Sequence, residues 1–529
     1  MSIVFISAII IGVVNPEGFY NIENSIVKIA FEQFGWLFQL SSVLFLAICL
    51  YLAVSKYGNI RLGGPKARPE LSNWNWFAIS LTAGIATGIL FWGIAEPITH
   101  FMSPPEGLGL EPGSESAAMF SMTQTFIHWT FSPYAMYGLA GVGIAFAVHN
   151  AKLPFQVSSV LYPVFGKRIT GTIGAVVDNL SLFAIAGGVA AVLGVGTMQI
   201  ATGLNVTVGL PNGKITWIVI VSIMVTTFII SSYTGLNRGI KWLSDANTKA
   251  FIAVAIFIFI FGPSLFILTL GTQSFGHYLQ EFFVRSLYLS PIEGSEWPRW
   301  WPIYYWAMWL AYAPLMGMFL ARISKGRTIR QFLMMTVLAP ALSGLLWFSI
   351  FGGSAINLQL SGADIWGSIQ KYGMEISVFS FLEHFPLTTI MSLLFIFIVY
   401  ISIVTMADSM TSTVASLSVR SLTSTSEPPG RVKIYWGIIM SSMAIINLIS
   451  AGGKISGIDA TKQLATIAGF PILFLMLLMA YTTVKFIVQQ EKYDVATYPE
   501  TATTRLETEE SDGQTENKLN EFSVEKQSV

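Results

Sequence analysis

The chain has 529 residues with 29 basic and 29 acidic side chains, so its net charge at pH 7 is zero and no basic field indicates a nucleic-acid partner. Hydrophobic residues make up 53% and charged residues only 11%, whereas soluble domains carry about 25% charged residues. The single cysteine, Cys49, excludes a disulfide framework and a thiolate metal site. This composition predicts an all-α integral membrane protein.

Twelve stretches are apolar and long enough to cross the roughly 30 Å hydrocarbon core of a bilayer. The first begins at Met1 and is short, which leaves open whether N-terminal residues are missing. It lacks the basic leading region and the small-residue cleavage site of a signal peptide. The predicted spans are 2–15, 33–54, 76–95, 119–148, 178–203, 214–232, 245–271, 302–321, 328–353, 388–417, 434–450 and 460–488.

The charge of the loops predicts the orientation of the chain. One alternating set of loops, which includes 55–75 and 322–330, carries 16 Lys and Arg residues, and the other set carries 7. Cytoplasmic loops of membrane proteins are enriched in Lys and Arg. We therefore expect both termini in the cytoplasm, which agrees with an even number of spans.

The spans fall into groups. Segment 275–297 is amphipathic and too polar to span, so we expect it to lie on the outer surface. It separates five spans in 76–271 from five in 302–488, and 1–55 adds two accessory spans. This is the hydropathy pattern of a five-plus-five inverted repeat, formed by spans 3–7 and 8–12. The first span of each repeat carries Gly or Pro in its middle, which is typical of interrupted helices at a midplane binding site.

The C-terminal segment 491–529 differs in kind from the rest. It is polar, with 10 acidic and 4 basic residues, and predicts a disordered cytoplasmic tail. Repulsion from anionic lipid argues against a lipid-sensing role for it.

Segment 304–314 reads YYWAMWLAYAP, in the middle of a predicted span. At 100° per residue, Tyr305, Trp309 and Tyr312 fall on one helix face, and Pro314 should kink the helix. Trp and Tyr favour the membrane interface, but Trp309 and Tyr312 lie too deep for that explanation.

Segment 128–138, HWTFSPYAMYG, supplies a second cluster around Pro133. Two such helices could form an aromatic cage that binds a quaternary ammonium group through cation–π attraction, worth about 2 kcal/mol when desolvated. No carboxylate lies beside either cluster in the sequence. From the residues alone, a cage and ordinary core packing are both open.

The stretch YWAMWLAYAPLMGMFLARISKGRTIRQF resembles the signature of the betaine/choline/carnitine transporter family, as do GIAEP at 93–97 and HWTFSPYAMYG. The similarity covers nearly the whole chain except the last 40 residues. It implies twelve helices with the inverted repeat, a homotrimer in a bacterial inner membrane, and a substrate with an onium head. Candidates are glycine betaine, carnitine, choline and the sulfonium compound dimethylsulfoniopropionate.

The resemblance also implies roles for individual residues. Met308 stands where the family places a second Trp, which weakens cation–π attraction at that wall. The implied positions are Trp129, Tyr134, Tyr137, Trp309 and Tyr312 for the cage; Met308, Ala83, Gly84 and Ala86 for its further wall; and Trp306 and Tyr305 for the periplasmic approach.

Coupling to sodium is doubtful by the same comparison. Thr405 is kept, but Met406 and Ala191 replace family hydroxyls, and Met316 matches a position where sodium-independent exchangers place a methionine. Ile85 lies in the glycine-rich stretch whose carbonyls would serve sodium. Sodium-independent exchange or uniport is favoured, with sodium-coupled symport as the alternative. Proton coupling is a third option, with Glu96, Asp178 and Asp408 as candidates.

Other classes of protein lack their signals. The five histidines are scattered and none pairs at metal-ligand spacing, so neither a metal nor another cofactor is expected. His128 has no partner at catalytic spacing, and no GxxxxGK[ST] motif appears. Enzyme and primary pump are therefore disfavoured, as is an ion channel, because the spans offer no charge rings.

Overall fold

In the computed structural model the secondary structure is helical, apart from one isolated bridge between Arg61 and Thr328 in the part of the chain that is described. The predicted all-α class is confirmed for these residues. The described ranges are 1–84, 88–234, 237–419, 428–450 and 457–500.

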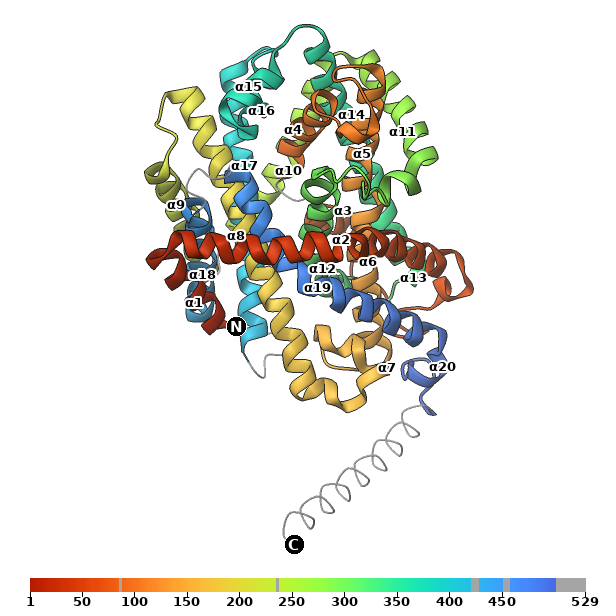
Figure 1. Ribbon diagram of the computed structural model, residues 1–529. Helices are drawn as coiled ribbons and strands as arrows, with labels where there is room; N and C mark the ends of the chain where they lie inside the picture. The colour runs from red at the N-terminus through yellow and green to blue at the C-terminus, as the bar shows by residue number, and fades with distance from the viewer. Residues whose placement is uncertain (85–87, 235–236, 420–427, 451–456, 501–529) are drawn as a thin grey trace.

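Helices of very different lengths follow one another along the chain (Figure 1). The first ten are α1 (Ser2–Val14), α2 (Pro16–Val54), α3 (Asn73–Gly84), α4 (Ile89–Met102), α5 (Glu115–Trp129), α6 (Phe131–Ala145), α7 (Tyr162–Phe165), α8 (Thr172–Val208), α9 (Lys214–Thr234) and α10 (Asn237–Phe261). The others are α11 (Ser264–Ser286), α12 (Tyr304–Ile323), α13 (Ile329–Leu333), α14 (Ala339–Leu360), α15 (Ile365–Tyr372), α16 (Ser377–Leu382), α17 (Thr388–Ser418), α18 (Gly430–Ser450), α19 (Gly457–Val488) and α20 (Gln490–Tyr493).

Within the described ranges, nine helical segments are long and apolar enough to cross a membrane, and α10 with α11 makes a tenth if the bent pair is one span. This agrees with an integral membrane protein. Two further expected spans fall on α1, which has 13 residues, and on α3 with α4, whose junction at 85–87 lies outside the described residues. Twelve spans and the inverted repeat therefore stay predictions.

The expected interruption near Pro133 lies at Thr130, whose backbone angles of −119° and −115° separate α5 from α6. Pro133 has no N–H to donate to the carbonyl of Trp129, which favours a break in the helical ladder at this point. By contrast, α12 continues through Pro314 to Ile323. The aromatic residues of α5 and α6 thus come from two helices that meet at a break.

Two helices differ in extent from the predicted segments. Helix α2 begins at Pro16 rather than near residue 33, because Asn15 caps its N-terminus through Oδ1 and the N–H of Gly18 (2.9 Å). Helix α11 begins at Ser264, is bent by 106° from α10, and ends at Ser286, whereas the surface helix was expected over 275–297.

Helix α2 crosses the middle of the molecule and packs against α6, α18 and α19 (Figure 1). Helices α15 and α16 lie at one end of the molecule, and α7 and α20 lie at the other. The first residues of the expected tail are folded, since Asp494 is buried and accepts a hydrogen bond from Asn150 (2.9 Å). Residues 501–529 lie outside the described part of the chain.

Candidate functional site

A cavity of about 970 Å³ lies among helices α4, α5, α6, α8, α10, α11, α12, α14, α17 and α19. Cavities of a few hundred to about a thousand Å³ are typical of small-molecule sites. No charged side chain appears among the described residues that line it. Its lining includes Gly88, Trp92, Trp129, Tyr137, Gly188, Tyr304, Met308, Trp309, Tyr312 and Met316.

Four of the five predicted cage residues line this cavity, namely Trp129, Tyr137, Trp309 and Tyr312. The fifth, Tyr134, does not line it and packs against Trp309 with 5.6 Å between ring centroids. Four of the predicted residues thus lie at one cavity, and Tyr134 lies behind Trp309; their role as a cage stays a prediction.

Trp309 lies at the centre of the cluster. Its ring centroid is 5.6 Å from that of Trp129 and 5.2 Å from that of Tyr137, with interplanar angles of 77° and 62°. Such edge-to-face pairs are favourable by about 0.5–1.5 kcal/mol beyond burial. Its indole nitrogen donates to the main-chain carbonyl of His128 (3.2 Å), which fixes the orientation of the ring.

Tyr312 closes the opposite part of the cage against α8. A Cβ atom on Gly188 would lie 3.1 Å from the ring of Tyr312, so only glycine leaves this ring its present place. The hydroxyl of Tyr312 has no hydrogen-bond partner within the described ranges, and its ring borders the cavity. The hydroxyl of Tyr312 is therefore available to form a hydrogen bond with a ligand in the cavity.

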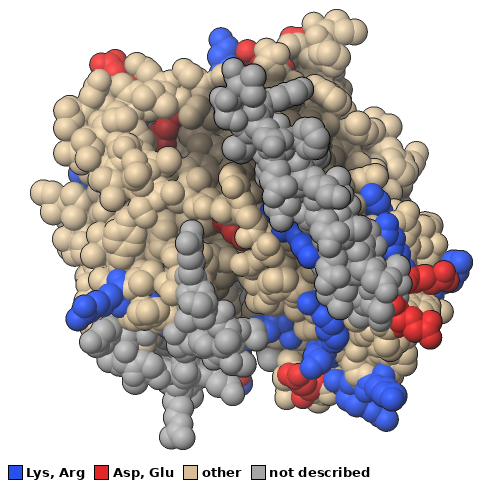
Figure 2. Space-filling model, turned by 90° about the horizontal axis from the view of Figure 1, so that it is seen from below, with Lys and Arg blue, Asp and Glu red and all other residues tan. Residues whose placement is uncertain are grey.

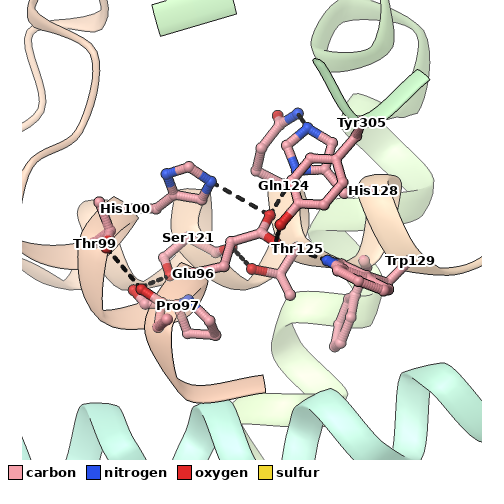
Figure 3. A network of polar contacts seen from close by, with 12 residues as sticks. Glu96, Pro97, Thr99, His100, Ser121, Gln124, Thr125, His128, Trp129 and Tyr305 are labelled. Carbon is pink, nitrogen blue, oxygen red and sulfur yellow. Dashed lines mark hydrogen bonds and ion pairs between the residues drawn. The ribbon is translucent and has the colours of Figure 1, made fainter. Parts of the chain in front are cut away.

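A buried carboxylate, Glu96 of α4, holds the aromatic wall in place (Figure 3). Its Oε2 accepts from the indole nitrogen of Trp129 (2.7 Å) and from the hydroxyl of Tyr305 (2.6 Å). Its Oε1 lies 2.5 Å from Nδ1 of His128 and 3.4 Å from Nε2 of His100. One side chain therefore connects α4, α5 and α12 just behind the cage.

This network corrects two expectations. The sequence showed no carboxylate beside the aromatic clusters and no grouped histidines, yet Glu96, His100 and His128 have ligand atoms within 4.8 Å of one another. Glu96 and His100 are four residues apart on α4, but the contacts of Glu96 with His128 and Trp129 cross 32 and 33 residues of sequence, which motif spacing does not register. Such a trio is compatible with a metal ion, but Nδ1 of His128 already contacts Oε1 of Glu96 (2.5 Å), and Oε2 of Glu96 already accepts from Trp129 and Tyr305. A hydrogen-bonded scaffold fits these contacts.

The two residues expected on the approach pathway lie behind the cavity wall. Tyr305 is fully buried, and its hydroxyl donates to Glu96 (2.6 Å). Trp306 donates from its indole nitrogen to Gln39 of α2 (2.6 Å). Neither lines the cavity, whereas their neighbours Tyr304 and Met308 do. Met308 is thus placed at a wall of the cavity, as expected from its position in the motif.

The predicted glycine-rich stretch lies only partly within the described chain. Ile85 and Ala86 fall outside it, and Ala83 and Gly84 are described only as the backbone end of α3. Gly88 lines the cavity, and a Cβ there would lie 3.0 Å from Trp92 and 3.8 Å from Trp129. Gly88 thus lets two indole rings approach each other.

The residues expected at the ion position also border the cavity, namely Ala191, Met316, Thr405 and Met406. The hydroxyl of Thr405 donates within its own helix, to the carbonyl of Ile401 (2.8 Å).

A polar pair lies close to these residues. Asn247 donates to the hydroxyl of Ser402 (2.7 Å), and its buried Oδ1 has no partner in the described residues. Lys249, two residues on, is exposed and pairs with Asp245 (2.6 Å).

The chain matches the model of the BCCT, betaine/carnitine/choline family transporter, over residues 1–492. The chain belongs to this family. It is 37% identical to a "Probable glycine betaine transporter" of Desulfitobacterium hafniense, over 90% of this chain and 93% of the relative. It is 36% identical to a glycine betaine transporter of Bacillus subtilis, over 89% and 90%. It is 34% identical to an osmo-independent choline transporter of Acinetobacter baylyi, over 88% of each.

Membership of the betaine/carnitine/choline family makes the chain a multi-pass membrane transporter and not an enzyme. The resemblance stated from the ARIS-GRTIR stretch is confirmed. The relatives differ in the charge of the compounds that name them, since glycine betaine is a zwitterion and choline is a cation.

Proposed function

We propose that this chain is a secondary transporter of betaine-type quaternary ammonium or related onium solutes, which it binds in the Trp/Tyr cage and carries by alternating access. Transport is by sodium-independent exchange or uniport. The observation that carries the proposal is the cavity wall made of Trp129, Tyr137, Trp309 and Tyr312.

The chemistry of this wall suits an onium head. A trimethylammonium group cannot donate hydrogen bonds, so it gains little from carboxylates and much from aromatic faces. No charged residue appears among the described lining residues, and the rings of Trp129 and Trp309 are held by hydrogen bonds at their rims. These faces are therefore left free for a cation.

The side chains near the expected ion position support transport without sodium. Sodium is a hard cation that prefers oxygen ligands, and Met406, Met316 and Ala191 offer none at the cavity wall. Among the residues expected at the ion position, Thr405 alone carries a side-chain oxygen, and its hydroxyl donates to the carbonyl of Ile401 (2.8 Å).

Sodium-coupled symport is the second candidate, and one observation favours it. Oδ1 of Asn247 is buried without a partner in the described part of the chain, and it lies beside Ser402, which also borders the cavity. Two oxygens of this kind are suitable ligands for sodium. Proton coupling through Glu96 is not favoured, because four hydrogen-bonding groups surround that carboxylate.

Uptake into proteoliposomes tests the proposal. Labelled glycine betaine, carnitine, choline and dimethylsulfoniopropionate are compared with and without a sodium gradient, and with unlabelled substrate inside. We expect the uptake rate to be independent of the sodium gradient and to rise with the concentration of unlabelled substrate inside. Loss of uptake without sodium would instead support the symporter, and absence of uptake and binding for every onium compound would overturn the cage.

We propose that the protein lies in a bacterial inner membrane with both termini in the cytoplasm. We also propose that it forms a homotrimer, on family resemblance alone. Lys and Arg side chains gather on the face that carries α7 and α20 (Figure 2), which supports a cytoplasmic position for that face.

A further inference from the structure

A buried lysine, Lys462 of α19, lies among three aromatic rings. Its side chain is 3% exposed, and Nζ is 4.4 Å from the ring centroid of Trp301, 5.4 Å from that of Tyr304 and 5.6 Å from that of Trp92. The carboxylate of Asp459, one helical turn earlier, lies 3.6 Å away. A charged side chain buried inside a membrane protein is costly, so its position points to a function.

Several neighbours offset the cost of burying the ammonium group of Lys462. Three aromatic faces attract an ammonium group, and Asp459 pairs with it. Asp459 is 41% exposed, so water screens its charge on the outer side, whereas the aromatic rings separate Lys462 from the interior. The ammonium group is therefore paired with Asp459 and also faces the aromatic rings.

Two of these rings are walls of the cavity. Trp92 and Tyr304 both line it, so Lys462 lies one aromatic ring behind the wall. Trp92 and the cage residue Trp129 both approach Gly88, where a Cβ atom would lie 3.0 Å and 3.8 Å from them. Lys462 is thus close to the cage without touching its contents.

An opposite charge lies behind the neighbouring part of the same wall. Glu96 accepts from the indole nitrogen of Trp129 (2.7 Å), and it is fully buried. Glu96 is behind the cage ring and Lys462 is behind Trp92 and Tyr304. A molecule in the cavity therefore meets an anionic end at the cage and a cationic end beside it.

We infer that Glu96 and Lys462 together make the cavity selective for zwitterionic onium compounds over onium cations, with Lys462 as the residue that determines this specificity. The inference rests on the proposed function. The onium head lies against Trp129 and Trp309, and the anionic end of the substrate lies toward Trp92 and Tyr304. A cation such as choline has no anionic end and is repelled by Lys462.

The size of the effect follows from the placement. Two unit charges separated by about 10 Å in a medium of intermediate dielectric change affinity by roughly tenfold. The sign is opposite for the two ligand classes, since Lys462 attracts a carboxylate and repels a second cation. The onium head is common to both ligands, so the ratio of the two affinities reports the attraction of the carboxylate and changes by about the same factor.

A structural role is the rival explanation, in which Lys462 only fills the space between α4, α12 and α19. Its loss would then weaken the binding of both ligand classes alike, or lower the thermal stability, and would leave the ratio of affinities unchanged. The ratio therefore separates the two explanations.

Equilibrium binding of glycine betaine and of choline to the purified full chain provides the test. The variants are Lys462→Met, Lys462→Arg and, as a matched control, Lys485→Met, which alters a lysine at the other end of α19 that donates to the carbonyl of Pro163. We expect the wild type to prefer glycine betaine, Lys462→Met to reduce that preference by about tenfold, and the other two variants to keep it.

A second variant, Asp459→Asn, tests the inference even if Lys462→Met does not fold. Asp459→Asn removes the compensating charge and leaves the lysine, so the preference for glycine betaine should rise by a few-fold. An unchanged ratio in both Lys462→Met and Asp459→Asn, or a wild type that prefers choline, would overturn the inference. If the wild type binds neither ligand, the proposed function itself fails.

Discussion

The indole nitrogen of Trp309 donates to the main-chain carbonyl of His128 over 3.2 Å. In an uninterrupted helix that oxygen would accept from the N–H of Ser132. Because α5 ends at Trp129 and α6 begins at Phe131, the carbonyl is free for a side chain of another helix. The break at Thr130 thus orients the central ring of the cage.

Trp309→Leu removes the central aromatic face, so binding of an onium ligand should weaken by about 30-fold, the equivalent of about 2 kcal/mol of cation–π attraction. Trp309→Phe keeps a ring but loses the bond to His128, and should weaken binding less. Titration calorimetry measures both. Trp436→Leu is the control, since this buried tryptophan bonds to Ser418 and lies outside the cavity; equal losses in the control would contradict the assignment.

Glu96→Gln keeps the size of the side chain but places an amide N–H₂ toward groups that themselves donate. Because glutamine keeps one acceptor oxygen, either Trp129 and Tyr305 or His128 lose their acceptor, and charge-assisted bonds of this kind contribute roughly 1.5–3 kcal/mol. We expect weaker ligand binding by about tenfold or more and a lower melting temperature. Glu23→Gln is the matched control, because that buried carboxylate accepts from Asn447 far from the cage and should leave ligand affinity unchanged.

Gly188→Val should abolish binding by pushing Tyr312 into the cavity. A Cβ at this position already lies 3.1 Å from the ring, so Gly188→Ala should give a partial loss and valine a complete one. Gly276→Ala meets no atom within 4 Å and should bind ligand as the wild type does. Binding by Gly188→Val at wild-type affinity would show that the ligand lies elsewhere.

Glu375 predicts a pH dependence of stability outside the spans. Burial raises the pKa of its carboxyl group above the ordinary value, and one of its oxygens has no partner within the described ranges. The folded chain therefore holds the proton more tightly than the unfolded chain, so the free energy of unfolding falls as the pH rises from the ordinary pKa to the raised one. Above the raised pKa the loss is constant.

Glu375→Gln should consequently raise the melting temperature at about pH 8, and the gain should disappear near pH 4. Thermal unfolding in detergent, followed by intrinsic fluorescence across this range, measures the difference. Glu383→Gln, an exposed neighbour, should show no such trend. A gain that grows toward acidic pH would have the wrong sign for a buried carboxylate.

Much of the helix layout follows from the sequence, because apolar length alone distinguishes a span from a loop. The stretch predicted over 178–203 is found within α8, and that over 434–450 within α18. The failures are at helix ends set by local bonds. Asn15 extends α2 toward the N-terminus through a cap, and the bend before Ser264 divides a stretch that hydropathy treats as one.

The aromatic lining of the cavity was predictable in part, because Trp309 and Tyr312 are unusual residues inside a predicted span. Its support was not. Glu96 was considered only as a proton carrier, and its bonds to Trp129 and Tyr305 depend on how α4 packs against α5 and α12. Lys462 fell inside a predicted span, yet its place beneath Trp301 comes from the approach of α19 to α12.

The single carboxylate of Glu96 also bears on how the molecule can open. It binds groups from α5 and α12 while belonging to α4, so separating any two of these helices would expose a charge and break short hydrogen bonds inside the membrane. We expect α4, α5 and α12 to move as one rigid body when the cavity opens. Opening to either side of the membrane would then occur where this body slides past α8 and α17, across the cavity.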